Sequence, residues 1–143
     1  MPVLWSREEI YFVAERGYRL YLEGQFHPAA ILFEGLSSID PKNAYCRKAL
    51  GVIAIAMGQS RLAVAHFSAV IAHDRLDLDA LAGRCEALLA AGDLPAARRD
   101  LASVAVMPGG ASHARRLTLQ FQQQSEFPTG PSQSSQLPSE APR

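Results

Sequence analysis

The chain has 143 residues, of which 14 are Lys or Arg and 14 are Asp or Glu, so its formal net charge is zero. This balance gives no field that would attract phosphates, and no run of like charges forms a basic arm, so we expect no nucleic-acid partner. Hydrophobic residues make up 48% of the chain, which is enough for one domain with its own core.

The cysteine spacing and the hydropathy pattern indicate the cellular location of the protein. Cys46 and Cys85 lie far apart without a CxxC spacing, so we expect neither a disulfide framework nor a zinc site. The longest strongly apolar run, 49–57, is much shorter than the roughly 20 residues of a membrane-spanning helix. Residues 1–9 lack the basic and apolar regions of a secretory signal. We therefore expect no membrane insertion and a location in a reducing cytoplasm.

Helical patterns follow one another along most of the chain. Ser6 and Glu9 form a capping-box pattern at the start of the first helix, and Pro28 and Pro95 suit the first turn of later helices. After the break at 108–110, Ser112 is placed to cap a last helix. We expect helices at 7–23, 27–38, 43–57, 60–73, 77–91, 95–105 and 112–124. From residue 125 onwards the chain is rich in Ser, Pro and Gln, which predicts a disordered tail.

A repeat of 34 residues organises these helices. Glycine recurs at Gly24, Gly58 and Gly92, and the same register relates three alanines, at 29, 63 and 97. A small residue recurs at 17, 51 and 85, and a large apolar one at 33, 67 and 101. Small residues let two helices approach closely, and glycine allows the left-handed turn between them. The period predicts three units, at 10–43, 44–77 and 78–111.

This pattern of small, glycine and aromatic positions resembles the tetratricopeptide repeat (TPR), in which each unit is a pair of antiparallel helices. The resemblance implies an all-α fold of three helical hairpins in a right-handed superhelix. We expect an N-terminal lead-in at 1–9 and a capping helix at 112–124. That helix carries Ala114, Leu117 and Phe121 on one face, which suits a lid over the last unit, and the tail occupies 125–143.

The first helix of each unit is expected to line a concave face. At about 100° per residue, unit positions 2, 5, 9, 12 and 13 cluster on one side of that helix. The candidate groove residues at these positions are Tyr11, Ala14, Tyr18, Tyr21, Leu22, Tyr45, Lys48, Val52, Ile55, Asp79, Glu86 and Leu89. All four tyrosines of the chain belong to this set, and tyrosine is common in binding sites, so the pattern predicts a groove for an extended apolar peptide. The alternative is that this face is buried by its own curvature or by a terminal segment.

No catalytic constellation is evident in the sequence. His66 and His73 would lie about 10.5 Å apart on one helix, too far to share a metal. Cys46 lies near a helix start, where its pKa could be lowered, but a half-buried cysteine is the commoner case. Cys85 stands in a small-residue position, and no GxxxxGK[ST] phosphate loop is present. We therefore expect no enzymatic activity, no metal and no cofactor.

Two stretches, 17–33 (GYRLYLEGQFHPAAILF) and 49–59 (ALGVIAIAMGQ), are similar to repeats of the TPR chaperones of bacterial type III secretion. The resemblance implies a nonenzymatic cytoplasmic chaperone whose groove holds an apolar segment of a translocator or export component. Translocator chaperones and the smaller export-apparatus chaperones are both compatible with it. A dimer is compatible too, although the long N-terminal arm through which translocator chaperones dimerise has no counterpart before the first repeat.

A generic TPR adaptor or assembly scaffold is the alternative function. Repeats that bind heat-shock-protein tails resemble a clamp of Lys and Asn for a terminal carboxylate. This chain has Ala14, Tyr18, Ala49, Asp79 and Gly83 at those positions, so we expect no such tail as its ligand.

Overall fold

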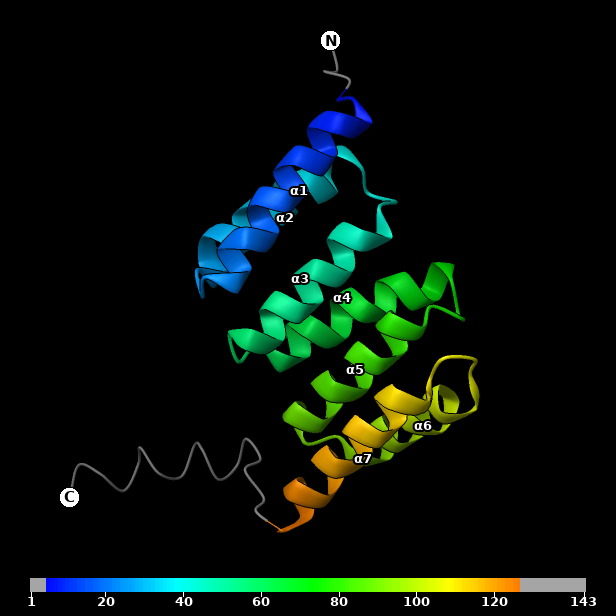
Figure 1. Ribbon diagram of the computed structural model, residues 1–143. Helices are drawn as coiled ribbons and strands as arrows, with labels where there is room; N and C mark the ends of the chain where they lie inside the picture. The colour runs from blue at the N-terminus through cyan, green and yellow to red at the C-terminus, as the bar shows by residue number, and fades with distance from the viewer. Residues whose placement is uncertain (1–4, 127–143) are drawn as a thin grey trace, which may run out of the picture.

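The computed structural model describes residues 5–126 and contains seven helices in that range (Figure 1). They are α1 (Arg7–Leu22), α2 (Phe26–Ile39), α3 (Ala44–Ala56), α4 (Ser60–His73), α5 (Leu78–Ala91), α6 (Leu94–Val106) and α7 (Ala111–Glu126). Each end lies within two residues of its predicted position. The expected tail begins too early, because residues 125 and 126 belong to α7, and its remainder lies outside the described residues. None of the seven helices is long and apolar enough to cross a membrane.

Side-chain caps fix most of the helix starts. The Ser6 hydroxyl accepts a hydrogen bond from the Glu9 amide at 3.1 Å, and the Glu9 carboxylate accepts one from the Ser6 amide at 2.7 Å. The predicted capping box is therefore confirmed. Asn43, Asp77 and Asp93 cap α3, α5 and α6 in the same way, each accepting from a backbone N–H three residues later.

The predicted cap at Ser112 is wrong. Helix α7 begins at Ala111, so Ser112 lies inside its first turn, and the Gly110 carbonyl accepts the Ala114 amide at 2.8 Å. A Cβ atom at Gly110 would lie 1.9 Å from the Val104 carbonyl oxygen. The residue before α7 must therefore be a glycine, because the backbone at Gly110 lies too close to α6 for a side chain.

The turns inside the three hairpins follow the repeat. Gly24, Gly58 and Gly92 have φ angles of 79°, 76° and 85°, in the left-handed region that side chains disfavour. Each glycine follows the first helix of its pair, and the next residue donates its N–H back to that helix, as Gln59 does to the Ala54 carbonyl at 2.8 Å. The role predicted for these glycines is confirmed.

Large aromatic side chains fill the seams between helices. Phe67 is 1% exposed, and a Cβ atom would lie 2.6 Å from its ring at Gly51 and 2.5 Å from it at Gly83. Phe33 lies against Gly17 in the first unit in the same manner. The small residues of the repeat are therefore required by the rings that pack on them.

A buried ion pair joins the two helices of the last hairpin, and a hydrogen bond connects it to the hairpin before. The Arg84 guanidinium donates to both oxygens of the Asp100 carboxylate, at 2.7 and 2.8 Å, and to the Ser68 hydroxyl at 3.3 Å. These residues come from α5, α6 and α4. Because the Asp100 side chain is only 7% exposed, the bidentate pair compensates the cost of burying its charge.

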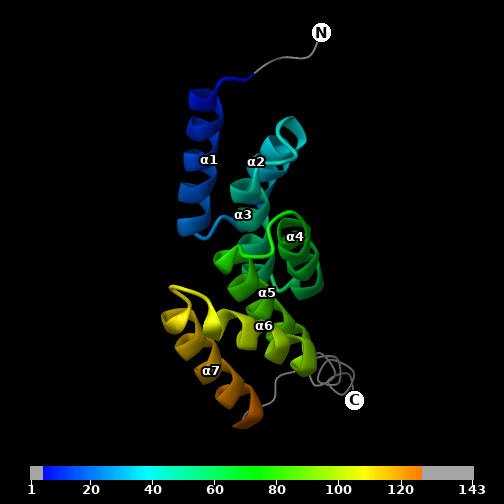
Figure 2. The same cartoon turned by 90° about the vertical axis from the view of Figure 1, so that its right-hand side faces the viewer.

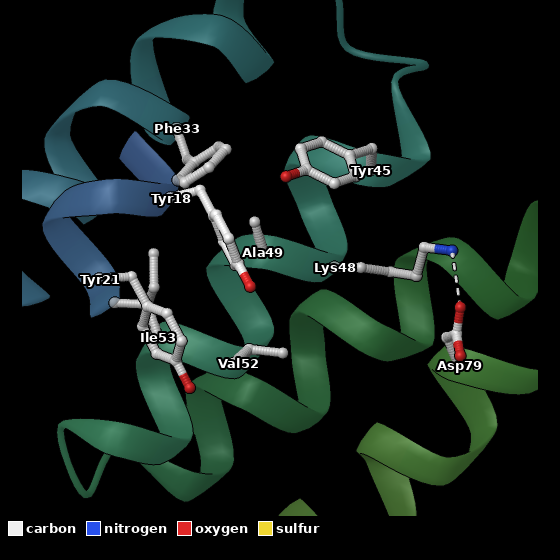
Figure 3. Close-up of a pocket in the computed structure, with 9 residues that line it drawn as sticks. All are labelled: Tyr18, Tyr21, Phe33, Tyr45, Lys48, Ala49, Val52, Ile53 and Asp79. Atoms are coloured by element: carbon white, nitrogen blue, oxygen red, sulfur yellow. Dashed lines mark ion pairs between the residues drawn. The ribbon is translucent and has the colours of Figure 1, made fainter. Parts of the chain in front are cut away.

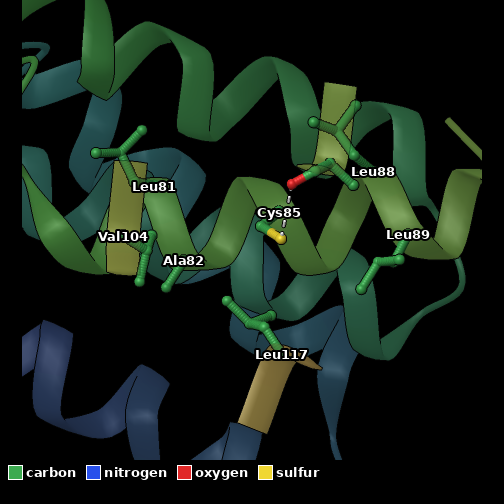
Figure 4. Close-up of a cluster of buried hydrophobic side chains, with 8 residues drawn as sticks. Leu81, Ala82, Cys85, Leu88, Leu89, Val104 and Leu117 are labelled. Atoms are coloured by element: carbon green, nitrogen blue, oxygen red, sulfur yellow. Dashed lines mark hydrogen bonds between the residues drawn. The ribbon is translucent and has the colours of Figure 1, made fainter. Parts of the chain in front are cut away.

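Helix α7 packs on α5 and α6 and closes the array. Leu117 is fully buried there beside Leu81, Cys85 and Val104 (Figure 4), and Ala114 and Phe121 pack against the same cluster. This is the apolar face predicted for the capping helix. In Figure 2, α1 and α7 lie on the same side of the stack of helices, one at each end.

Candidate functional site

An apolar hollow of about 230 Å³ lies where α1, α2 and α3 meet, and we call it the groove hollow (Figure 3). Tyr18 and Tyr21 enter from α1, with ring centroids 6.4 Å apart. Tyr45 enters from the start of α3, and its ring meets the edge of Phe33 at 6.1 Å. The hollow is lined by Tyr18, Tyr21, Phe33, Tyr45, Lys48, Ala49, Val52, Ile53 and Asp79.

The one cation that lines the groove hollow in the described part of the chain, Lys48, is paired with carboxylates of the protein. The Lys48 ammonium lies 3.0 and 3.2 Å from the two carboxylate oxygens of Asp77 and 4.0 Å from the Asp79 carboxylate. Asp77 is held in place because it also caps α5 through the Ala80 amide. The Lys48 charge is therefore engaged within the protein, and the hollow offers mainly apolar and aromatic contacts.

A second hollow, of about 510 Å³, adjoins the first and shares Tyr18 and Tyr45 with it. We call it the tyrosine–carboxylate hollow. It lies between the N-terminal half of α1 and the turn that joins α2 to α3, and Tyr11 brings a third tyrosine to it. Burial raises the pKa of Tyr45, and the proximity of the Cys46, Tyr18 and Tyr11 side chains adds to the effect. The four tyrosines are thus gathered on two adjoining hollows.

Other candidate groove residues lie elsewhere. Leu89 is 4% exposed and belongs to the core under α7, so its placement in an open groove was wrong. Glu86 is covered by the same helix, where its carboxylate accepts from Arg116 at 3.2 Å and from Gln120 at 3.1 Å. Helix α7 therefore covers Glu86 and Leu89 on α5, and the two hollows are lined mainly by residues of the first two units.

Three further candidates occupy intermediate places. Ala14 is buried and lies at the floor of the tyrosine–carboxylate hollow, and Ile55 is half-buried against the core below α4. Leu22 is exposed and lines neither hollow. Helical periodicity missed Phe33 and Ile53, because they reach the hollow from the seams between helices. Only the spatial fit of α2 against α3 brings them there.

Both cysteines are buried, and neither they nor the histidines belong to a metal-binding cluster in the part of the chain that the structure describes. Burial raises the pKa of the Cys85 thiol to about 12, and burial with the nearby Asp40 carboxylate raises that of Cys46. A lowered pKa for Cys46, which its place near a helix start would allow, is thus contradicted. Cys85 instead donates to the Ala97 carbonyl at 3.3 Å, the hydrogen bond drawn as a dashed line from Cys85 in Figure 4. Within residues 5–126 no group of three or more His, Cys, Asp or Glu side chains is arranged to hold a metal.

No protein-family model and no curated protein matches the chain, but solved structures match it in fold. PcrH from Pseudomonas aeruginosa has a TM-score of 0.76 at 21% identity, covering 85% of this chain and 96% of that chain. Yersinia enterocolitica SycD, a type III secretion chaperone in complex with a peptide of the translocator YopD, has 0.72 at 22%, covering 82% and 92%. The first TPR of Spaghetti (RPAP3), bound to an HSP90 peptide, has 0.69 at 16%, covering 82% and 96%.

The fold is therefore that of an all-helical TPR-like protein. Its structural neighbours include type III secretion translocator chaperones and a TPR domain. The match covers more than nine-tenths of the PcrH and SycD chains, so the likeness extends over nearly their whole length and is not limited to a single hairpin.

Proposed function

We propose that this protein is a nonenzymatic chaperone whose concave face binds an extended, apolar segment of a type III secretion client. The groove hollow carries the proposal, because it gathers three tyrosines and several aliphatic side chains in one open depression. Tyr18 is 49% exposed and Tyr45 52%, although both are large and partly apolar. An exposed cluster of aromatic rings is typical of a surface that a partner covers.

The fold neighbours support the identity of the ligand. SycD was solved with a peptide of the translocator YopD, and PcrH with the chaperone binding regions of PopB and of PopD. By analogy, the ligand here is a segment of a secreted translocator or export component, held in the bacterial cytoplasm before export. Shielding an apolar segment prevents its aggregation and keeps it unfolded.

The open surface limits the length of the client segment. The groove hollow and the tyrosine–carboxylate hollow are formed by α1, α2, α3 and the start of α5, whereas α7 covers the rest of α5. We infer that the segment lies across the first two units. A longer segment would have to displace Leu117 from the core, which costs several kcal/mol.

The proposal is tested with a phage-displayed library of twelve-residue peptides selected on the full chain. The strongest peptide is then titrated by calorimetry against Tyr18→Ala, Tyr21→Ala and Phe12→Ala. Phe12 is the matched control, because it is an exposed aromatic residue of α1 that lines neither hollow. Loss of a central aromatic anchor costs about 2 kcal/mol, so Tyr18→Ala should weaken binding by roughly thirtyfold and Phe12→Ala should not.

Two results would contradict the proposal. One is a selection that enriches no apolar peptide. The other is that Tyr18→Ala and Tyr21→Ala bind the peptide as tightly as Phe12→Ala and the unchanged protein do, with all four shown by circular dichroism to be folded. This result would mean that the binding site lies on another face.

A generic TPR adaptor is the second candidate, and the likeness to the TPR of RPAP3 favours it. The charge of the groove does not suit an acidic peptide tail, because Lys48 is already paired with Asp77. An adaptor of another kind would join folded partners through other faces, and Tyr18→Ala would leave its assembly intact. Neighbouring genes that encode secretion components would favour the chaperone.

A further inference from the structure

The tyrosine–carboxylate hollow differs from the groove hollow in its chemistry. Three tyrosines line it, Tyr11, Tyr18 and Tyr45, and all three are about half exposed or more. Tyr18 and Tyr45 line both hollows, and Figure 3 shows the Tyr45 hydroxyl turned toward Tyr18. Aromatic faces carry negative electrostatic potential, so several rings around one space favour a cation there.

Carboxylates add to this potential. Asp40 and Glu15 line the hollow together with a single basic residue, Arg7. Among residues 5–126 the Asp40 carboxylate forms no ion pair, whereas Glu15 is joined to Arg19 at 3.2 Å on the exposed surface of α1. The Asp40 carboxylate is also close to Cys46, a buried residue that lines the hollow, because its negative charge contributes to the raised pKa of the Cys46 thiol.

The position of Asp40 is fixed by the backbone. It is the residue that ends α2, its amide donates to the Leu36 carbonyl at 2.9 Å, and its own carbonyl accepts the Asn43 amide at 3.0 Å. Asn43 in turn caps α3 through the Cys46 amide at 3.2 Å. The carboxylate is thus carried by a short, well-bonded turn, so little ordering is needed when a ligand arrives.

We propose that the tyrosine–carboxylate hollow binds a lysine or arginine side chain of the client segment, beside an apolar side chain in the groove hollow. The inference rests on the proposed function and adds a charge requirement to it. The cation lies against the rings of Tyr11, Tyr18 and Tyr45, with the Asp40 carboxylate as its counterion. Because the two hollows share Tyr18 and Tyr45, the basic and apolar residues are close neighbours in an extended segment.

The experiment uses the peptide selected from the phage library and replaces each of its positions in turn by lysine, norleucine or glutamate. Norleucine has the aliphatic stem of lysine without the ammonium group. We expect one position at which lysine binds about tenfold more tightly than norleucine, with glutamate weakest. The preference should disappear in Asp40→Asn and shrink at high salt, and it should persist in Glu8→Gln, which removes an exposed carboxylate of α1 outside both hollows.

A second probe, N-acetyl-lysine methylamide, tests the hollow without the peptide. Nuclear magnetic resonance should show shifts of the ring signals of Tyr11 and Tyr45 that are larger than those caused by the norleucine analogue, and smaller in Asp40→Asn. Equal binding of lysine and norleucine at every position would overturn this inference and leave peptide binding standing. A lysine preference that survives Asp40→Asn would overturn it as well, and failure of every peptide to bind would overturn both proposals.

Discussion

The packing of Phe67 between two glycines allows a sharp test of the repeat architecture. Gly51 belongs to the same hairpin as Phe67, and Gly83 belongs to the next hairpin, on α5. A Cβ atom at Gly83 would lie 2.5 Å from two carbons of the ring, whereas carbon atoms in ordinary contact are about 3.5–4.0 Å apart. In Gly83→Ala the ring therefore has to move by about 1 Å.

The structure leaves the ring little room for this movement, because Gly51 lies close to the same ring carbons and Phe67 is only 1% exposed. Overpacking of a core costs about 1–3 kcal/mol, and we place this site near the upper end. Alanine gains about 1 kcal/mol over glycine in a helix interior. The expected net loss for Gly83→Ala is therefore about 2 kcal/mol, a sizeable part of the free energy of unfolding of a small domain.

Urea denaturation followed by circular dichroism measures this loss. The matched control is Gly35→Ala on α2, where a Cβ atom would meet nothing within 4 Å, so the control should be stabilised by about 1 kcal/mol. Adding Phe67→Leu to Gly83→Ala should make the two changes cost less together than the sum of their separate effects. If Gly83→Ala is as stable as Gly35→Ala, the close approach of the two hairpins at this ring is wrong.

Three other experiments test the left-handed turn at Gly58, the Arg84–Asp100 ion pair and the two buried thiols. Gly58→Val should cost about 1–2 kcal/mol, because the backbone is left-handed there, and a Gly58→Val protein as stable as the parent in urea would refute this. Arg84→Met should cost about 3 kcal/mol by leaving the buried Asp100 carboxylate unpaired. The double change Arg84→Met with Asp100→Leu should recover most of that loss, and equal instability of the two proteins would contradict it. Cys46 and Cys85 should resist alkylation at pH 8 until the protein unfolds, since burial raises both pKa values, that of Cys85 to about 12. Rapid labelling of the folded protein, measured by mass spectrometry, would exclude this.

The features that the sequence predicted correctly depend on local geometry. The capping box at Ser6 joins residues three positions apart, and the left-handed turn at Gly58 depends on a single residue. The helix ends follow from these local signals together with the apolar period. Each signal occurs in all three units of the repeat. The role of Cys85 as a small packing residue can therefore be predicted from its position, which is occupied by glycine in the first two units.

Other features could be decided only by the tertiary structure, because they depend on which helices meet. Periodicity predicts Leu89 on the groove side of α5, but it contains no information on the packing of α7 against α5, which buries Leu89. Phe33 and Asp40 reach the two hollows from the second helix of a unit and from its end, through the fit of α2 against α3. The sequence by itself thus determines the repeat and the tyrosine-bearing faces. The extent of the open groove and its charge are set by long-range packing, since a residue's burial depends on neighbours that are distant in the chain.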